Sequence, residues 1–302
     1  MRSHGRRTPS LEDCCGPGCK RNTTKLHEII VRTKYARIRS SMLVNLRPHH
    51  QGSPRNCGSL QLNLEMAPSI WKKNAAVAYP VGLIRGLSLF CKYRGRTMVP
   101  ARLYAENLAL LAMTLRNPDL NRGSVVECGT WRGGMSAGMV EMAGLHRNFH
   151  FFDSFEGLPP AGERDGEKAK EYMSAPIHYD YGDCGASLEE FKQTLSMTGC
   201  PEENIGIHKG FFENTLPHFS PPPIAILRLD ADWYDSTMIC LEKFWDHVLP
   251  GGLILIDDYY VWEGCSKAVH AFFAKREATA HLRQGPIGRV AFIIKEAYAP
   301  AV

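Results

Sequence analysis

Short apolar runs recur along the second two-thirds of the chain and predict the strands of one sheet. They lie at residues 124–128, 149–152, 205–208, 224–229 and 253–256. Helical or loop segments separate them, which is typical of a parallel sheet with crossover helices. Before the first run, Leu108, Leu111 and Leu115 follow a three- and four-residue spacing that predicts one face of a helix. We therefore expect an α/β fold with a doubly wound, Rossmann-like sheet.

The two ends of the chain differ from this regular part. Residues 278–283 and 290–295 flank a turn at 284–288 and predict an antiparallel strand pair, so the sheet is expected to be mostly parallel with an antiparallel edge strand. Residues 1–65 lack periodicity and predict a flexible extension. Residues 66–100 predict a helical segment that acts as a lid or in oligomerisation, and residues 101–302 form the main domain.

Composition and charge narrow the class of protein. With 302 residues, of which 44% are hydrophobic and 22% charged, the chain is long enough to bury a full core. The net charge of +5 is uneven, because residues 1–65 hold 12 Lys and Arg against 4 Asp and Glu. The remaining body is slightly acidic, so we expect no nucleic-acid partner there.

The polar N-terminus and the apolar stretch before residue 92 bear on the protein's compartment and on its assembly. The first ten residues are polar, so the ten cysteines are expected to be reduced thiols of a cytoplasmic enzyme. The longest apolar stretch, 75–91, contains Pro80 and Arg85 and is too short for a membrane span. Residues 67–89 carry more apolar surface than a lid helix needs, which suggests a homo-oligomer.

Glycines follow the first predicted strand and indicate a ligand site. Gly129, Gly133 and Gly134 are spaced GxxxGG, which is not the dinucleotide fingerprint GxGxxG. Glycine at such a turn lets a ligand approach the backbone, and the next helix offers unpaired N–H groups. Asp153, at the end of the second strand, is placed to accept hydrogen bonds from ribose hydroxyls, although a helix cap or turn would also explain it.

Carboxylates end the fourth and fifth predicted strands. Asp230 follows one, and Asp257 and Asp258 follow the other. Three acids at the same end of a sheet repel each other unless a hard cation binds between them, and oxygen ligands suit magnesium or another divalent cation. Caps and loop carboxylates are the alternative interpretation.

Five motifs in the chain resemble the macrocin O-methyltransferase family. They are GTWRGG, FFDSFEGLP, GFFENTLP, LDADWYDST and LPGGLILIDDY, and the resemblance covers residues 98–295. It implies a methyltransferase domain that uses S-adenosylmethionine and magnesium. It also implies an acceptor that is a small molecule, namely a sugar hydroxyl of a glycosylated natural product, and so a role in natural product biosynthesis.

The resemblance also implies which residues bind the cofactor and the metal. The implied cofactor residues are Glu127, Gly129, Gly133, Ser136, Asp153, Ser154 and Ser187. Asp230, Asp257 and Asp258 are again the metal ligands. Ser187 is independently a capping-box candidate. The catalytic base stays open between Asp230, Asp232 and His208, since each follows or ends a predicted strand.

Two other functions remain as alternatives. A methyltransferase for catechols or phenolic acids would use the same acids, but resemblance to those enzymes leads one to expect Asn where this chain has Asp258. A non-catalytic cofactor-binding protein would have no need of three acids around a metal. The polar insertion 159–185 is expected to close over the cofactor as a lid, unless it is a solvated surface loop.

Overall fold

The computed structural model describes residues 69–174, 184–277 and 280–296, with side chains from residue 77 onward. The predicted flexible extension 1–65 lies outside the described residues. The helices of the described part are α2 (Ser69–Tyr93), α3 (Ala101–Thr114), α4 (Gly134–Ala143), α5 (Glu167–Ser174), α6 (Leu188–Ser196), α7 (Phe212–Thr215), α8 (Tyr234–Phe244) and α9 (Glu263–Arg276). None of them combines the length and apolar character that crossing a bilayer requires.

The strands form one sheet of seven in the order β3-β2-β1-β4-β5-β7-β6. Their bounds are β1 (Ser124–Cys128), β2 (Phe149–Asp153), β3 (Ile205–Lys209), β4 (Ile224–Leu229), β5 (Val248–Ile256), β6 (Arg283–Gln284) and β7 (Ala291–Ile294). The first five strands pair in parallel, and β7 is antiparallel to both β5 and β6. The predicted Rossmann-like sheet with an antiparallel edge is confirmed, although β6 has only two residues.

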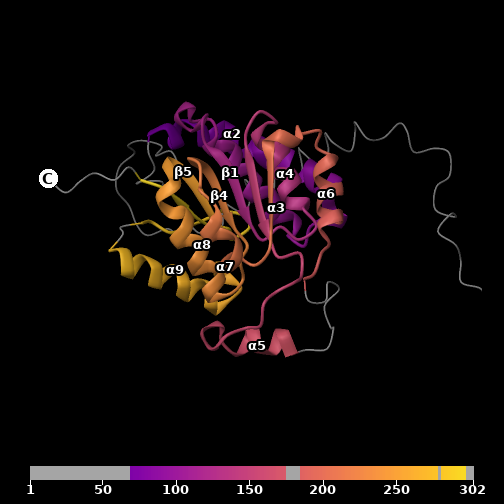
Figure 1. The fold of residues 1–302 in the computed structure, drawn as a ribbon. Coiled ribbons are helices and arrows are strands. Elements are labelled where there is room, and N and C mark those ends of the chain that lie inside the picture. Colours follow the sequence, from indigo (N-terminus) through magenta and orange to yellow (C-terminus); the bar gives the residue numbers. More distant parts are fainter. Residues whose placement is uncertain (1–68, 175–183, 278–279, 297–302) are drawn as a thin grey trace, which may run out of the picture. The chain divides into compact units, whose positions relative to one another are not determined.

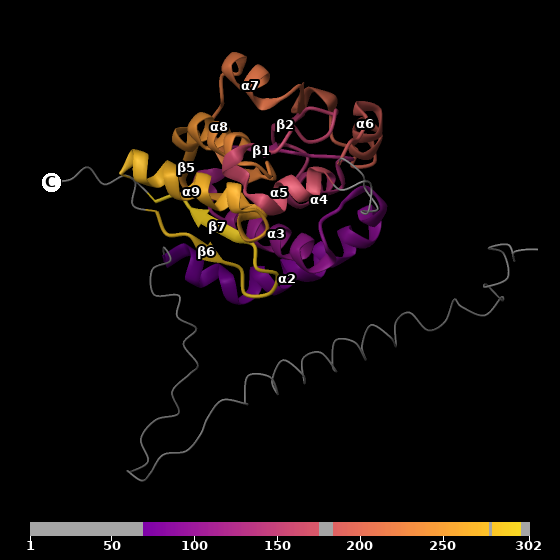
Figure 2. The ribbon, with the colours of Figure 1, turned by 90° about the horizontal axis from the view of Figure 1, so that it is seen from below.

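Successive side chains along the strands point to opposite faces of the sheet and pack into two apolar cores, one on each face. Val125 of β1 packs with residues of α2, α3, α4 and α6, whereas Val126 packs with residues of α8 and α9. Figure 2 shows α2 and α3 on the side of the sheet opposite to α8. This is the doubly wound arrangement, in which ligands bind beyond the carboxyl ends of the strands. In Figure 1, α5 lies beyond one end of the sheet.

Helix α2 confirms that the segment before residue 100 is helical. It packs closely on α3, because a Cβ atom on Gly82 or Gly86 would lie 2.8 Å from a Cα atom of α3. A 3₁₀ turn, η1 (Arg94–Arg96), follows and leads to α3. Val77, Val81 and Ile84 are exposed on α2. Whether this segment acts as a lid or in oligomerisation stays a prediction.

Candidate active site

The turn after β1 depends on glycine for both space and backbone angle. Gly129 has φ +84°, and a Cβ atom on it would lie 1.8 Å from the carbonyl oxygen of Asp230. Gly133 has φ +79° and immediately precedes α4. Both angles lie in the left-handed region that favours glycine. The missing side chain at Gly129 therefore lets the ends of β1 and β4 touch.

Asp153, at the end of β2, is bound to this glycine turn. Its Oδ2 accepts hydrogen bonds from the backbone N–H groups of Thr130 at 2.7 Å and Trp131 at 2.9 Å. Its Oδ1 accepts from the backbone N–H of Phe155 at 2.7 Å. The carboxylate thus fixes the turn after β1 and also faces the cavity described below.

Glu127 and Ser136 lie behind the turn and are fully buried. The Ser136 hydroxyl donates to Glu127 Oε2 at 2.5 Å. Burial raises the pKa of the Glu127 carboxyl to about 7, although Arg228 and the Ser136 hydroxyl both lower it. In this conformation the two side chains support the turn from inside. They line neither of the two cavities that are described below.

Arg228 is the functional residue that the sequence analysis missed. It is 0% exposed, and its guanidinium lies 2.9 Å from Glu127 Oε1, 2.9 Å from Asp230 Oδ2 and 2.8 Å from Asp257 Oδ1. It therefore connects the support of the glycine turn with the strand-end acids. The sequence does hold a sign of it, because Arg228 is the one charged residue within the apolar strand β4. A charge buried in a sheet requires a partner, so carboxylates near it could have been expected.

The three strand-end aspartates come together as predicted. Asp230, Asp257 and Asp258 each offer one oxygen, and these oxygens all lie within 4.8 Å of one another. Burial raises the pKa of Asp257 to about 6 and that of Asp258 well above its usual value, and the neighbouring carboxylates add to both shifts. A divalent cation would relieve this repulsion, and the all-oxygen donor set fits magnesium.

Asp232 lies beside the aspartate cluster and is held in a strained conformation. Its φ is +53°, in the left-handed region. Its Oδ1 accepts a hydrogen bond from Trp262 Nε1 at 2.8 Å, and its backbone N–H donates to Asp258 Oδ2 at 3.0 Å. The bond from Trp262 thus orients the Asp232 carboxylate, and the bond to Asp258 holds the Asp232 backbone at the edge of the cluster.

Most of the predicted residues surround two adjoining cavities of about 210 and 60 Å³. Both are lined by Gly129, Asp153, Asp230 and Asp232, and Ser154 lines the smaller one. The larger cavity is also lined by Met98, Val99, Pro100, Thr130, Trp131, Gly157, Leu158, Cys184, Asp257 and Asp258. The glycine turn, the end of β2 and the acidic cluster therefore open onto one site.

Five predicted residues line neither cavity. Glu127, Gly133 and Ser136 belong to the glycine turn or its support, and their contacts with the cofactor stay predictions. Ser187 and His208 lie elsewhere. Ser187 caps α6 and accepts a hydrogen bond from the backbone N–H of Glu190 at 3.2 Å, as the capping-box alternative stated. His208 stacks on Phe152, with ring centroids 4.2 Å apart, and also contacts Phe219. Neither residue lines the two cavities. Their proposed contacts with cofactor or acceptor stay predictions.

The described part of the polar insertion is tied to the loops after β4 and β5. Trp233 Nε1 donates to the Pro159 carbonyl at 2.8 Å, and the backbone N–H of Tyr234 donates to Asp165 at 2.6 Å. Lys168 donates to the Val261 carbonyl at 2.9 Å. Residues 175–183 lie outside the described residues. Closure of this insertion over the cofactor stays a prediction.

The sequence is similar to those of known O-methyltransferases. The chain is 33% identical over 154 residues to the 8-demethyl-8-(2,3-dimethoxy-alpha-L-rhamnosyl)-tetracenomycin-C 4'-O-methyltransferase of Streptomyces olivaceus, a match that covers 50% of this chain and 58% of the relative. It is 32% identical over 157 residues to the demethyldecarbamoylnovobiocin O-methyltransferase of Streptomyces niveus, covering 51% and 59%. The matches thus span less than two thirds of either relative.

The solved structure of the O-methyltransferase NovP shares the fold. It superposes with a TM-score of 0.58 at 22% identity, covering 74% of this chain and all of that one. The two proteins therefore share a Rossmann-like α/β fold. The model of the macrocin O-methyltransferase (TylF) family matches residues 93–291. This range includes the glycine turn and the acidic cluster that line the larger cavity. The chain belongs to the macrocin O-methyltransferase family.

Proposed function

We propose that the protein is an O-methyltransferase that uses S-adenosylmethionine and a divalent cation such as magnesium. The observation that carries this proposal is the shared cavity, in which Gly129 and Asp153 lie next to Asp230, Asp257 and Asp258. The residues that we propose for the cofactor and those that we propose for the metal therefore line the same space. Such adjacency suits transfer of a group from a bound donor to a metal-oriented acceptor.

The acceptor is a hydroxyl of a small molecule, and we propose a sugar of a glycosylated natural product. The relatives' names support this class, because one of them describes methylation of a rhamnosyl group. The acidic residue at Asp258, in place of the amide expected for catechol enzymes, also favours the sugar.

The chain's own residues position the reactants. When bound, S-adenosylmethionine supplies the electrophilic methyl group and the cation supplies Lewis acidity toward the acceptor hydroxyl. The turn at Gly129, held by Asp153, would form one wall of the cofactor site. Asp230, Asp257 and Asp258 would hold the cation, and Arg228 balances part of their charge. Of the three candidates for the base, we propose Asp232, because it lines both cavities and accepts a hydrogen bond from Trp262.

The metal site is tested by calorimetric titration of magnesium into the wild type, Asp257→Asn and Asp235→Asn. Asp235 is a matched control, because it is exposed on α8 and pairs with Arg164. We expect Asp257→Asn to weaken magnesium binding by at least roughly 10–100-fold, the cost of losing even an outer partner of a metal ligand. Asp235→Asn should bind like the wild type.

Turnover is tested with methyl-labelled S-adenosylmethionine and glycosylated polyketides as acceptors, with catechol as the alternative acceptor. We expect label in the sugar, and loss of transfer on chelation of the metal. Transfer that is equal with and without a chelator would contradict the metal-assisted part of the proposal. Label in catechol alone would contradict the sugar acceptor.

A further inference from the structure

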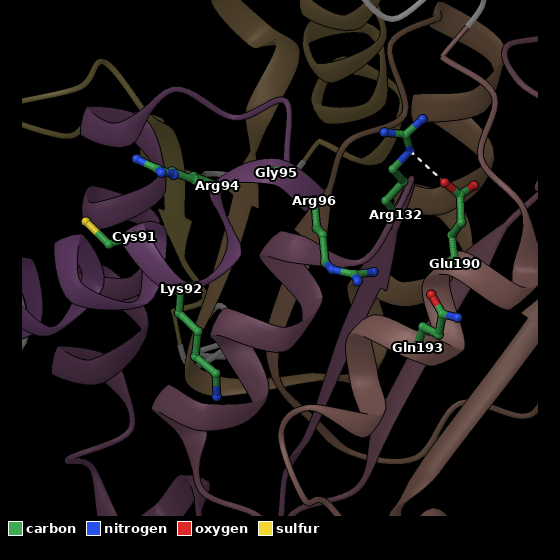
Figure 3. Close-up of a pocket in the computed structure, with 8 residues that line it drawn as sticks. All are labelled: Cys91, Lys92, Arg94, Gly95, Arg96, Arg132, Glu190 and Gln193. Atoms are coloured by element: carbon green, nitrogen blue, oxygen red, sulfur yellow. Dashed lines mark ion pairs between the residues drawn. The ribbon is translucent and has the colours of Figure 1, made fainter. Parts of the chain in front are cut away.

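A third cavity, which shares no lining residue with the two at the proposed methyl-transfer site, lies between η1, α6 and the glycine turn (Figure 3). Its volume is about 460 Å³. Lys92 and η1 form one wall, and Arg132 with the first turns of α6 forms the other. None of the strand-end aspartates lines it. The cavity therefore needs its own explanation.

The lining of this cavity has an excess of positive charge. Lys92, Arg94, Arg96 and Arg132 line it, against one carboxylate, Glu190. Lys92 is already paired with Glu141 at 2.6 Å, so the excess of positive charge belongs to the arginines. Arg132 Nε lies 3.2 Å from that carboxylate. Within the described part of the chain, no ion pair joins Arg94 or Arg96 to a carboxylate. A concave surface with unbalanced guanidinium groups attracts anions, and the planar fork of arginine fits phosphate oxygens.

The two arginines nearest α6 are held in place before any ligand binds. Arg96 Nη1 donates to Thr194 Oγ1 at 3.1 Å, and Thr194 Oγ1 donates to the Arg132 carbonyl at 2.5 Å. The Arg132 guanidinium lies over the Trp131 ring, 4.6 Å from its centroid, and is paired with Glu190. Fixed donors lose less conformational freedom on binding, which favours affinity.

The segments that form the walls of this cavity also border the proposed methyl-transfer site. Trp131, on which Arg132 stacks, lines the larger of the two cavities described above. Residues 98–100, just after η1, line it as well. The backbones touch, because a Cβ atom on Gly134 would lie 2.4 Å from the Arg96 carbonyl oxygen. A ligand between Arg96 and Arg132 would thus contact both segments that border the cofactor site.

We propose that this cavity binds the phosphate group of a small phosphorylated molecule, with Arg96 and Arg132 as its main ligands. The phosphate belongs either to the methyl acceptor itself or to a separate phosphorylated compound. Binding of phosphate here does not depend on the methyl-transfer activity, so it can be tested without a known acceptor.

The test is calorimetric titration of inorganic pyrophosphate into the full chain and three variants. Arg96→Gln and Arg132→Gln each remove one guanidinium, and we expect each to weaken binding about tenfold or more. Lys192→Gln is the matched control, because it also removes one positive charge. Lys192 is exposed on α6, beside the cavity, and does not line it. It should bind like the wild type. Thermal unfolding checks that each variant is folded.

Two results would overturn the proposal. One is a folded wild type with no saturable pyrophosphate binding at millimolar concentration. The other is an equal loss of affinity in Lys192→Gln and Arg96→Gln, which would reveal general attraction to a basic surface. If Arg96→Gln does not fold, Arg96→Lys keeps the charge without the fork and should still bind more weakly than the wild type.

A second arm separates the two sources of the phosphate. Glucose 1-phosphate carries sugar hydroxyls, and inorganic phosphate does not. Tighter binding of glucose 1-phosphate, lost in Arg96→Gln, supports the site and assigns the phosphate to an acceptor of the sugar class. Equal affinity for both, lost in the same variant, supports the site and assigns it to a separate phosphorylated ligand.

Discussion

Replacing Arg228 by methionine is expected to lower the free energy of unfolding by about 3–5 kcal/mol, because it leaves buried carboxylates without their counter-charge. The guanidinium is 0% exposed and lies 2.8–2.9 Å from Glu127, Asp230 and Asp257. At an effective dielectric constant of about 20, each such contact is worth roughly 6 kcal/mol before desolvation is subtracted. Methionine keeps much of the volume, so a cavity adds little.

Urea unfolding followed by circular dichroism measures this effect. The control is Lys275→Met, because Lys275 pairs with Glu242 on the surface and should contribute no more than about 1 kcal/mol. The double variant Arg228→Met/Glu127→Gln should recover part of the loss, since it removes one of the unpaired carboxylates. An Arg228→Met cost as small as that of Lys275→Met would refute this reasoning.

Three further predictions concern backbone, pH and capping. Gly129→Ala should lower the free energy of unfolding by about 2–5 kcal/mol, since its Cβ would meet the Asp230 carbonyl. The control is Gly199→Ala, where φ is +70° but no atom lies near the added Cβ. It should lower the free energy of unfolding by only ~1–2 kcal/mol, and thermal unfolding measures both changes. Burial lowers the pKa of His150 to about 4, so its unfolded form takes up a proton first as pH falls. Wild-type stability relative to His150→Phe should therefore fall between pH 6.5 and 4 in urea unfolding, and a constant difference would contradict this. Ser187→Ala should cost about 1 kcal/mol through its lost cap, and an accompanying loss of S-adenosylmethionine affinity would reveal a cofactor contact as well.

Strand-end chemistry was predictable from the sequence because parallel strands present their carboxyl ends at one edge. Asp230, Asp257 and Asp258 follow β4 and β5, which are neighbours in the sheet. Apolar runs in the sequence predicted those strands. Acids directly after two parallel strands that are neighbours in the sheet lie close together at its edge. The same reasoning placed Asp153 at the edge, although its bonds to the glycine turn could not be foreseen from spacing.

Contacts across the sheet were not predictable, because they depend on which strands pair and in which register. Glu127 and Arg228 are direct register partners on β1 and β4, yet 101 residues separate them in the chain. The structure buries Glu127 against Arg228 and Ser136, contacts that its position in the sequence did not indicate. The cofactor role that the family resemblance implies for Glu127 stays a prediction. The bond from Trp262 to Asp232 likewise needs the tertiary fold to bring two loops together.

Calorimetric titration of S-adenosylmethionine into the full chain and into Asp153→Ala tests the central claim most directly. Asp153 holds the glycine turn and lines the cavity, so its loss should affect the cofactor site while circular dichroism shows a folded protein. We expect saturable binding to the wild type and at least about tenfold weaker binding to the variant. A folded wild type that does not bind S-adenosylmethionine would contradict the proposed methyl transfer.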